Sequence, residues 1–459
     1  MLDGPVAIAA CEALARRISG RLLPCGLDAA HLRCDELSFL AAAREAPART
    51  ALVADGRAWT YGDLAPDVTA ACRRLGGQRR AVVVAEARRE TIVTIWAALE
   101  LGIPLVPLHP RLTDLERLKL AARLDEHPPS GGAAAIIFTS GTTGEPKGVV
   151  LRRENLIASA QASARNLGSG SDDVWLLCMP LGHVGGLSIL FRSLAARGTV
   201  VLLPRFDPPA VLDAIRAHGV TVLSVVPAML GALIEADRDR ALRLPRAILV
   251  GGDAAPRALL EGCRAKGLHA LVTYGLTEAS SQVATQAPGD PIGQDEGAGR
   301  PLGGVEVRIV EGRVEIRGPT VMAGYLGQPP LAPGDWLDTG DTGSIDSSGR
   351  LHVSSRRADL IVTGGENVSP VEVERALESL PSIRAALVHG VPDDRWGELV
   401  AALLVPAGSP PCDSELWAQM ASVLAPHKRP RLIRWLASLP VDTMGKLLRR
   451  GGHLGTTRG

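Results

Sequence analysis

The sequence predicts an α/β fold, because short β-rich runs alternate with helical runs over most of the chain. From Thr50 onward, strand-like segments such as 174–178 and 199–203 are each followed by apolar residues at helical spacing. Strands that alternate with helices of about 10 to 15 residues favour parallel sheets covered on both faces. After Gly303, closely spaced strand-like runs with Gly-rich turns predict a small antiparallel β subdomain instead.

The same periodicities place the individual elements. We expect strands at 133–138, 174–178, 199–203, 221–226, 247–250, 305–310, 313–317 and 350–353. We expect helices at 91–101, 154–167, 209–218, 228–236, 370–380 and 414–424. Residues 123–132 are interpreted as a short Pro/Gly connection.

The length of the chain and the change in its pattern of strand-like and helical runs indicate more than one domain. The chain has 459 residues, of which 46% are hydrophobic and 22% charged, as in a globular protein with ample core. We expect a large N-terminal domain over residues 38–355 and a small α+β C-terminal domain over residues 356–459. Residues 1–37 form an unassigned N-terminal preface.

Composition excludes several classes of function. A formal net charge of +1 argues against a general nucleic-acid surface. Seven cysteines without a Cys-x-x-Cys pair indicate neither a disulfide framework nor a zinc site, so reduced thiols and a cytoplasmic location are expected. No segment has the roughly 18 consecutive apolar residues of a membrane span, and no membrane partner is expected.

Residues 136–148 form the most informative segment, in which an apolar strand runs into hydroxyls, glycines and one lysine. Glycines let backbone N–H groups approach an anion, hydroxyls donate hydrogen bonds, and the lysine adds positive charge. The phosphate-binding candidates are Thr139, Ser140, Gly141, Thr142, Thr143, Gly144 and Lys147. The segment lacks the Gly-Lys-Ser/Thr of a Walker A loop, and the alternative is a polar hairpin between two strands.

This loop resembles the phosphate-binding signature of the acyl-adenylate-forming superfamily, and further segments match that family in the same order. They are the Tyr-Gly-Leu-Thr-Glu of 274–278, the Thr-Gly-Asp of 339–341, the hinge and glycine loop of 356–370, and the Pro-Val-Asp-Thr-Met-Gly-Lys of 440–446. The resemblance runs from about residue 39 to residue 449. It implies ATP, Mg²⁺ and CoA as ligands and a mobile C-terminal domain.

The resemblance also implies roles for single residues. Glu278 corresponds to the family's magnesium ligand, Thr277 to its α-phosphate contact, and Lys446 to its catalytic lysine. The remaining ATP-binding candidates are Gly251, Gly252 and Asp253 for adenine, Tyr274, and Asp341 with Arg356 for the ribose; Gly364, Gly365 and Glu366 are expected beside the CoA channel.

Each of these residues also has an ordinary structural alternative. Glu278 would suit the N-terminus of a helix, and Asp341 would suit a turn after Thr-Gly. Residues 251–256 would serve as a strand-to-helix turn, and Lys446 would be an exposed surface lysine.

The acid-binding side chains are sought in residues 179–194 and 277–285, which look most like o-succinylbenzoate–CoA ligases of menaquinone biosynthesis. His183 corresponds to a gate between the ATP and acid sites, or else is a turn histidine. Ser188 and Arg192 share one face of an apolar helix, and Gln282 and Thr285 are further candidates. Arg192 must reach solvent, pair with a protein acid or bind an anionic part of the substrate, because an unpaired buried guanidinium costs several kcal/mol.

The sequence therefore favours an acid–CoA ligase that uses ATP and proceeds through an acyl-AMP intermediate. Another aryl- or acyl-CoA ligase, an adenylation protein that loads a carrier-protein thiol, and a non-catalytic binding relative are the alternatives. The expected partners are small molecules, namely a carboxylic acid, ATP and CoA, and a homodimer is left open.

Overall fold

A computed structural model describes residues 36–128, 132–139, 146–253, 255, 257–290, 297–355 and 360–439. The chain forms two compact units. Unit 1 comprises Met1–Pro110, His127–Ile137 and Gly148–Ser355, and unit 2 comprises Arg111–Glu126, Phe138–Lys147 and Arg356–Gly459. Among the helices of the described ranges, none combines the length and hydrophobicity that a membrane crossing requires.

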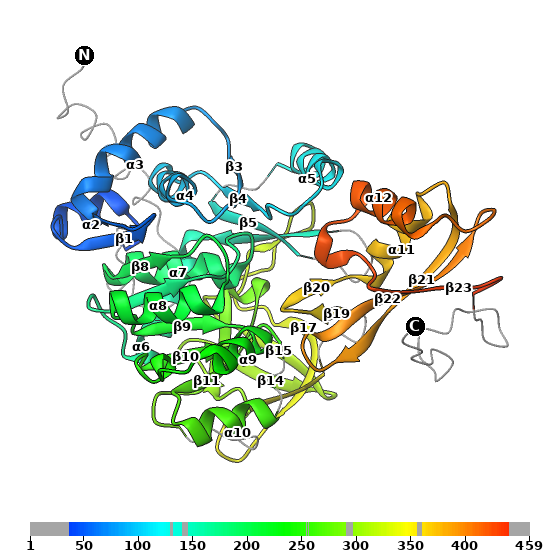
Figure 1. Ribbon diagram of the computed structural model, residues 1–459. Coiled ribbons are helices and arrows are strands. Elements are labelled where there is room, and N and C mark those ends of the chain that lie inside the picture. The colour runs from blue at the N-terminus through cyan, green and yellow to red at the C-terminus, as the bar shows by residue number, and fades with distance from the viewer. Residues whose placement is uncertain are drawn as a thin grey trace. The chain divides into compact units, whose positions relative to one another are not determined.

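The largest sheet of unit 1 has nine strands (Figure 1). In spatial order they are β13 (Arg300–Pro301), β12 (Ser281–Thr285), β11 (Ala270–Leu276), β10 (Ala247–Val250), β9 (Val222–Val225), β7 (Val174–Leu177), β8 (Thr199–Leu202), β1 (Thr50–Ala54) and β2 (Arg57–Thr60). The strands from β11 to β1 run parallel, whereas β12, β13 and β2 pair antiparallel at the edges.

Helices cover both faces of this sheet, because successive strand residues point to opposite sides. In β7, Trp175 and Leu177 belong to one apolar cluster and Leu176 belongs to another. The first cluster includes residues of α6 (Arg153–Leu167) and α7 (Val184–Ala196), and the second includes residues of α8 (Pro208–His218) and α9 (Pro227–Ala236). The other α-helices in the described part of unit 1 are α2 (Phe39–Glu45), α3 (Tyr61–Leu75), α4 (Arg89–Leu101) and α10 (Arg257–Lys266).

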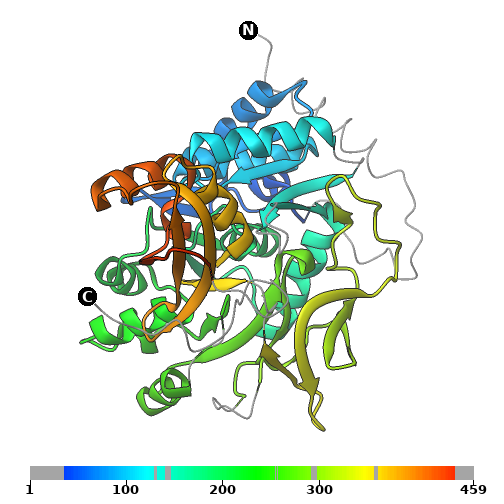
Figure 2. The ribbon, with the colours of Figure 1, turned by 90° about the vertical axis from the view of Figure 1, so that its right-hand side faces the viewer.

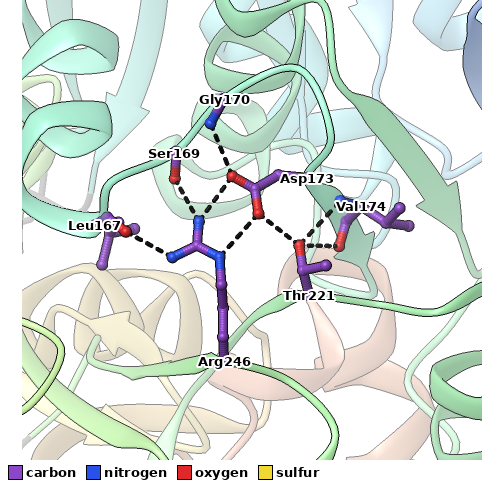
Figure 3. A network of polar contacts seen from close by, with 7 residues as sticks. All are labelled: Leu167, Ser169, Gly170, Asp173, Val174, Thr221 and Arg246. Carbon is purple, nitrogen blue, oxygen red and sulfur yellow. Dashed lines mark hydrogen bonds and ion pairs between the residues drawn. The ribbon is translucent and has the colours of Figure 1, made fainter.

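A network of polar contacts ties the loop before β7 to the segment before β10 (Figure 3). Arg246 donates to both carboxylate oxygens of Asp173, at 2.9 and 2.7 Å, and also to the Leu167 carbonyl oxygen and the Ser169 hydroxyl. Asp173 accepts in addition from the Thr221 hydroxyl at 2.7 Å. Burial alone would raise the pKa of Asp173, but these hydrogen bonds outweigh burial and lower it.

A second, five-stranded sheet of unit 1 has the order β16 (Gly324–Tyr325), β6 (Lys147–Arg152), β5 (Ala133–Thr139), β4 (Leu105–Leu108) and β3 (Ala81–Val84). The predicted antiparallel subdomain consists of β14 (Glu306–Val310), β15 (Arg313–Arg317), β17 (Leu337–Ile345) and β18 (Leu351–Ser355), drawn in yellow-green to yellow in Figure 2. The α/β fold with doubly covered, parallel-rich sheets and a small antiparallel β subdomain is thus confirmed.

One local prediction was wrong, and several elements, β17 among them, were not predicted. The connection expected over 123–132 begins only after Glu126, because α5 (Asp114–Glu126) continues through Leu124, which is buried. Strand β17 was not expected, since its Asp-Thr-Gly-Asp sequence has the composition of a turn. Pairing with β15 and β18 makes this segment a strand.

Unit 2 is an α+β unit around one sheet. Its strands follow the order β20 (Glu366–Val368), β19 (Ile361–Thr363), β22 (Gly397–Pro406) and β21 (Ile383–Asp393), with β23 (Leu432–Trp435) paired to β22. Its helices are α5, α11 (Pro370–Glu378) and α12 (Asp413–Val423). The ammonium group of Lys428 contacts Glu116 of α5 at 2.8 Å and Glu372 of α11 at 2.6 Å, and Lys428 is buried.

Candidate active site

The predicted adenine loop follows β10 at the carboxyl end of the parallel strands, where open α/β sheets usually bind ligands. Val250 of β10 pairs with Val272 of β11, so the ends of these strands lie side by side. A side chain at Gly251 would place a Cβ only 2.9 Å from the carbonyl oxygen of Thr273. The residue type is therefore fixed by close packing against β11, and the segment continues through Gly252 and Asp253.

Two predicted nucleotide-binding residues meet beside this loop. The hydroxyl of Tyr274, in β11, donates to Oδ2 of Asp341 at 2.6 Å. Both residues are buried. The backbone N–H of Asp341 donates to the Thr339 hydroxyl at 3.1 Å, which holds the aspartate in β17. The carboxylate is therefore held by a side-chain donor and a fixed backbone, as a rigid acceptor for ligand hydroxyls requires.

Thr277 and Glu278 form a short 3₁₀ turn directly after β11. The side chain of Glu278 is buried, and its Oε1 accepts a hydrogen bond from the Tyr325 hydroxyl at 2.8 Å. The carbonyl oxygen of Glu278 accepts from the backbone N–H of Met322. A single oriented carboxylate suits Mg²⁺, which binds few protein carboxylates and takes other oxygen ligands from phosphate and water.

Strand β6, which follows the predicted phosphate loop, pairs with the segment that carries Tyr325, the hydrogen-bond partner of Glu278. Tyr325 pairs with Val149 of β6, and Leu326 N–H donates to the Gly148 carbonyl oxygen at 2.7 Å. At the base of the loop, the Thr139 hydroxyl lies 3.5 Å from the carbonyl oxygen of Lys147. The predicted residues Ser140, Gly141, Thr142, Thr143, Gly144, Arg356 and Lys446 lie outside the described residues.

Helix α7 carries three of the predicted side chains. His183 is its N-cap residue, and its ring centroid lies 5.3 Å from that of His109. The hydroxyl of Ser188 donates to the Gly185 carbonyl oxygen at 3.0 Å. One turn later, Arg192 is 6% exposed, so the first of its three predicted fates, reaching solvent, does not occur.

Arg192 has few partners for a guanidinium with five N–H donors. Its Nη2 donates to the Ser281 hydroxyl at 3.1 Å, and its Cζ lies 5.7 Å from the centroid of the Trp175 ring. Its Nε is buried without an acceptor, and no carboxylate of the described residues pairs with it. Burial lowers the pKa of Arg192 to about 10, so the side chain keeps its charge at neutral pH.

Gln282 and Thr285 form a separate group around Thr273. The Gln282 amide donates to the Thr285 hydroxyl at 2.8 Å, and the hydroxyls of Thr285 and Thr273 are 2.7 Å apart. Oε1 of Gln282 is buried and finds no donor among the described residues. Because Thr273 also packs against Gly251, this pair lies toward the predicted adenine loop, and within the described ranges no hydrogen bond joins it to Arg192.

In unit 2, the glycine loop lies in the hairpin between β19 and β20. The Gly364 N–H donates to the Trp396 carbonyl oxygen at 2.8 Å, and a Cβ at Gly364 would lie 2.8 Å from the indole ring. Gly365 has a φ of 83°, and the following Glu366 is buried. The guanidinium groups of Arg431 and Arg395 lie 4.4 and 5.4 Å from the Trp396 ring centroid. The loop is thus packed on an aromatic ring flanked by two cations.

Comparison with known proteins agrees with this arrangement. A model of the AMP-binding enzyme family matches residues 117–326, and a model of the AMP-binding enzyme C-terminal domain matches residues 372–446. A 2-succinylbenzoate–CoA ligase of Bacillus cereus is 39% identical over 362 residues, which are 75% of this chain and 74% of the relative. The chain belongs to the AMP-binding enzyme family.

Solved structures of this family extend the comparison. An o-succinylbenzoate–CoA synthetase double mutant from Bacillus subtilis, bound to a product analogue, matches with a TM-score of 0.82 at 33% identity, covering 90% of this chain and 96% of the other. The enzyme from the same organism in complex with ATP and a magnesium ion matches with a TM-score of 0.65 at 33% identity, covering 90% and 98%. ATP binding by this AMP-binding enzyme follows from its family.

Four residues at the candidate site were not singled out in the sequence: Ser281, Tyr325, Trp175 and Trp396. Each contacts a predicted residue from a distant part of the chain, for example Tyr325 and Glu278 at a separation of 47 positions. Ser281 lies inside a predicted segment, but its neighbours Ser280 and Gln282 are equally polar. Only the backbone geometry distinguishes Ser281 in this AMP-binding enzyme.

Proposed function

We propose that this chain is an ATP-dependent 2-succinylbenzoate–CoA ligase. The observation that carries this proposal is Arg192, a buried cation that pairs with no carboxylate of the described residues and lies one helical turn from Ser188. 2-Succinylbenzoate has two carboxylates, so one can be activated while the other is left to bind a cation. The names of the relatives support the same substrate.

The proposed reaction has two steps. A carboxylate oxygen of the acid attacks the α-phosphorus of ATP, the bond to the β-phosphate oxygen breaks, and pyrophosphate leaves. The thiolate sulfur of CoA then attacks the acyl carbon of the acyl-AMP, AMP leaves, and the thioester remains. Positioning of the reactants and stabilisation of the shifting negative charge are the main tasks of the protein in both steps.

The nucleotide-binding residues suit the first step. We assign adenine to the loop at Gly251, Gly252 and Asp253, and the ribose to Asp341, whose carboxylate is held in place by Tyr274. Phosphates are assigned to residues 139–147 and to Thr277. Lys446, which lies outside the described residues, is proposed to stabilise the negative charge that develops between the carboxylate and the α-phosphate. His183 is proposed to lie between the ATP and acid sites.

Mg²⁺ is proposed to bind Glu278, whose Oε1 is oriented by the Tyr325 hydroxyl. When bound, the ion would neutralise charge on the phosphate oxygens during attack. The protein's own contribution is orientation, because Glu278 is buried and fixed both through its side chain and through its carbonyl oxygen.

CoA is proposed to approach along the Gly364–Glu366 loop in the second step. Arg395 and Arg431, which lie against the Trp396 ring, offer positive charge beside this loop. Positive charge of this kind suits the phosphates of CoA. A cytoplasmic location and a homodimer stay predictions from the sequence.

The deciding experiment is a pyrophosphate-release assay with ATP and CoA over 2-succinylbenzoate, benzoate, anthranilate, malonate and a fatty acid. We expect the highest kcat/KM with 2-succinylbenzoate, and turnover of CoA without any carrier protein. A higher kcat/KM with another acid would leave an acid–CoA ligase of different specificity. Release of pyrophosphate without thioester formation until a carrier protein is added would instead indicate an adenylation protein.

A further inference from the structure

Ser281 has an unusual backbone conformation. Its φ is 104°, whereas the other described non-glycine residues with positive φ lie between 50° and 59°, in the ordinary left-handed region. The preceding Ser280 is one of these, with a φ of 56°, so two successive residues with side chains have positive φ. Conformations of this kind are strained and persist only where surrounding contacts enforce them.

The surroundings enforce this conformation from several sides. The Ser280 hydroxyl donates to the Thr320 carbonyl oxygen at 2.8 Å, and the Ser280 carbonyl oxygen accepts from the Ser159 hydroxyl at 2.7 Å. On the neighbouring strand, a Cβ at Gly275 would lie only 1.7 Å from the carbonyl oxygen of Ser281. The β11–β12 register shifts at this point, between Tyr274 and Gly275. A glycine and a bulge therefore make room for the strained serine.

The strain directs the Ser281 hydroxyl at helix α7. Its Oγ accepts from Nη2 of Arg192 at 3.1 Å and lies 3.4 Å from the Ser188 hydroxyl oxygen. The Ser188 hydroxyl is the donor both to the Gly185 carbonyl oxygen, at 3.0 Å, and to Oγ of Ser281, at the longer distance, so Ser281 acts as an acceptor toward helix α7. Ser281 is thus the only described hydrogen-bond acceptor that a side chain offers to this buried guanidinium.

We propose that Ser281 is a positioning residue for substrate selection, which holds the Arg192 guanidinium in the orientation that binds the second carboxylate of a dicarboxylic acid. This proposal rests on the proposed function, since it concerns the arginine assigned there to the second carboxylate. One anchored N–H edge fixes the plane of a guanidinium, so its remaining N–H groups keep a fixed direction. Bidentate recognition of a carboxylate needs that fixed plane.

Two substitutions separate positioning from backbone support. Ser281→Ala removes the hydroxyl and keeps the strain, whereas Ser281→Gly removes the hydroxyl and relieves the strain, because glycine tolerates positive φ. We expect both variants to raise KM for 2-succinylbenzoate by about 3- to 10-fold, with KM for ATP unchanged. The midpoint temperatures of thermal unfolding should differ between the two variants, and the Ser281→Gly variant should have the higher one. If KM for 2-succinylbenzoate rises only in the less stable variant, although both variants lack the hydroxyl, the proposal is wrong.

A matched control and a double-mutant cycle complete the test. Ser193→Ala removes another buried hydroxyl of α7, which has no partner among the described residues, and should leave both KM values unchanged. In an Arg192→Met background, Ser281→Ala should no longer affect KM for the acid. Additive effects of the two substitutions would overturn the proposal.

The failure of this inference differs from the failure of the proposed function. If the wild-type enzyme prefers 2-succinylbenzoate and Arg192→Met raises its KM while the Ser281 variants do not, the function stands and the inference is lost. If another acid is preferred, the same cycle is run with that acid. Absence of coupling between Ser281 and Arg192 with the preferred acid would then refute the positioning role independently.

Discussion

Arg246 and Arg192 are both held within unit 1, but their surroundings are opposite. Arg246 contacts both oxygens of Asp173, a carbonyl oxygen and a hydroxyl, so its donors are largely satisfied by the protein (Figure 3). Arg192 is more deeply buried, yet a single hydroxyl and the face of an indole are its described partners. A saturated cation stabilises the fold, whereas an unsaturated buried cation lowers stability and is suited to an anionic ligand.

The largest effect on stability is expected at Arg246, whose donors are satisfied by Asp173 and its neighbours. Asp173→Ala removes a buried carboxylate that accepts hydrogen bonds from Arg246, Thr221 and Gly170, so it should lower the free energy of unfolding by about 3 kcal/mol, at about 1 kcal/mol for each donor residue. Urea unfolding followed by circular dichroism measures this loss. The kcat/KM of the folded protein should not change, because the network lies among structural loops. Lost activity at unchanged stability would erase the distinction between the two arginines.

A substitution at Arg192, whose buried Nε has no acceptor among the described residues, should impair substrate binding and not stability. Arg192→Met keeps much of the side-chain volume and removes a charge-assisted contact worth roughly 1.5 to 3 kcal/mol, so KM for 2-succinylbenzoate should rise strongly. KM for ATP should stay near its original value, and stability should be equal or higher because no unpaired charge is buried. A monocarboxylate analogue should lose little from the same substitution. If both acids lose equally, Arg192 has a structural role like that of Arg246.

Of the two arginine sites, only the Arg246–Asp173 network should lose stability when the pH is lowered. The folded-state pKa of Asp173 is lowered, so its contribution to stability is present above the ordinary aspartate pKa of about 4 and is lost as the pH falls toward the folded-state value. The difference in unfolding free energy between wild type and Asp173→Asn should therefore shrink below about pH 4. Denaturant titrations at neutral and acidic pH measure it. A constant difference would show that Asp173 contributes without its charge.

The smallest effect is expected at the ring beneath Arg192. Trp175→Phe retains an aromatic face but weakens the cation–π contact, which should change KM for the acid by the equivalent of about 0.5 kcal/mol. Steady-state kinetics with a fluorescence-independent assay can resolve this change. A loss as large as that in Arg192→Met would mean that the indole, and not Ser281, holds the guanidinium in place.

Local sequence patterns were sufficient to predict the elements with long apolar runs or clear helical spacing, but many of the described strands were not predicted. Continuous apolar runs in β7 and β10 and helical spacing in α4 and α11 are local signals, and these elements lie within a few residues of their expected positions. Strand β17 was missed because its glycine and aspartates favour a turn locally, and only pairing with β15 and β18 overrides that preference.

The candidate site divides in the same way. Motif residues such as Tyr274, Glu278 and Asp341 could be singled out because their order along the chain resembles a family pattern. Ser281 and Tyr325 were not, because their importance depends on a backbone dihedral and on contacts between distant strands. No periodicity in the sequence reports either quantity.

The buried lysine of unit 2 has a practical consequence for dividing this chain. Residues 111–126 precede most of unit 1 in sequence, yet Glu116 of α5 shares Lys428 with Glu372. A fragment that ended at residue 355 would retain this glutamate and lose its countercharge. Split-protein or truncation experiments should therefore assign α5 by its contacts and not by its place along the chain.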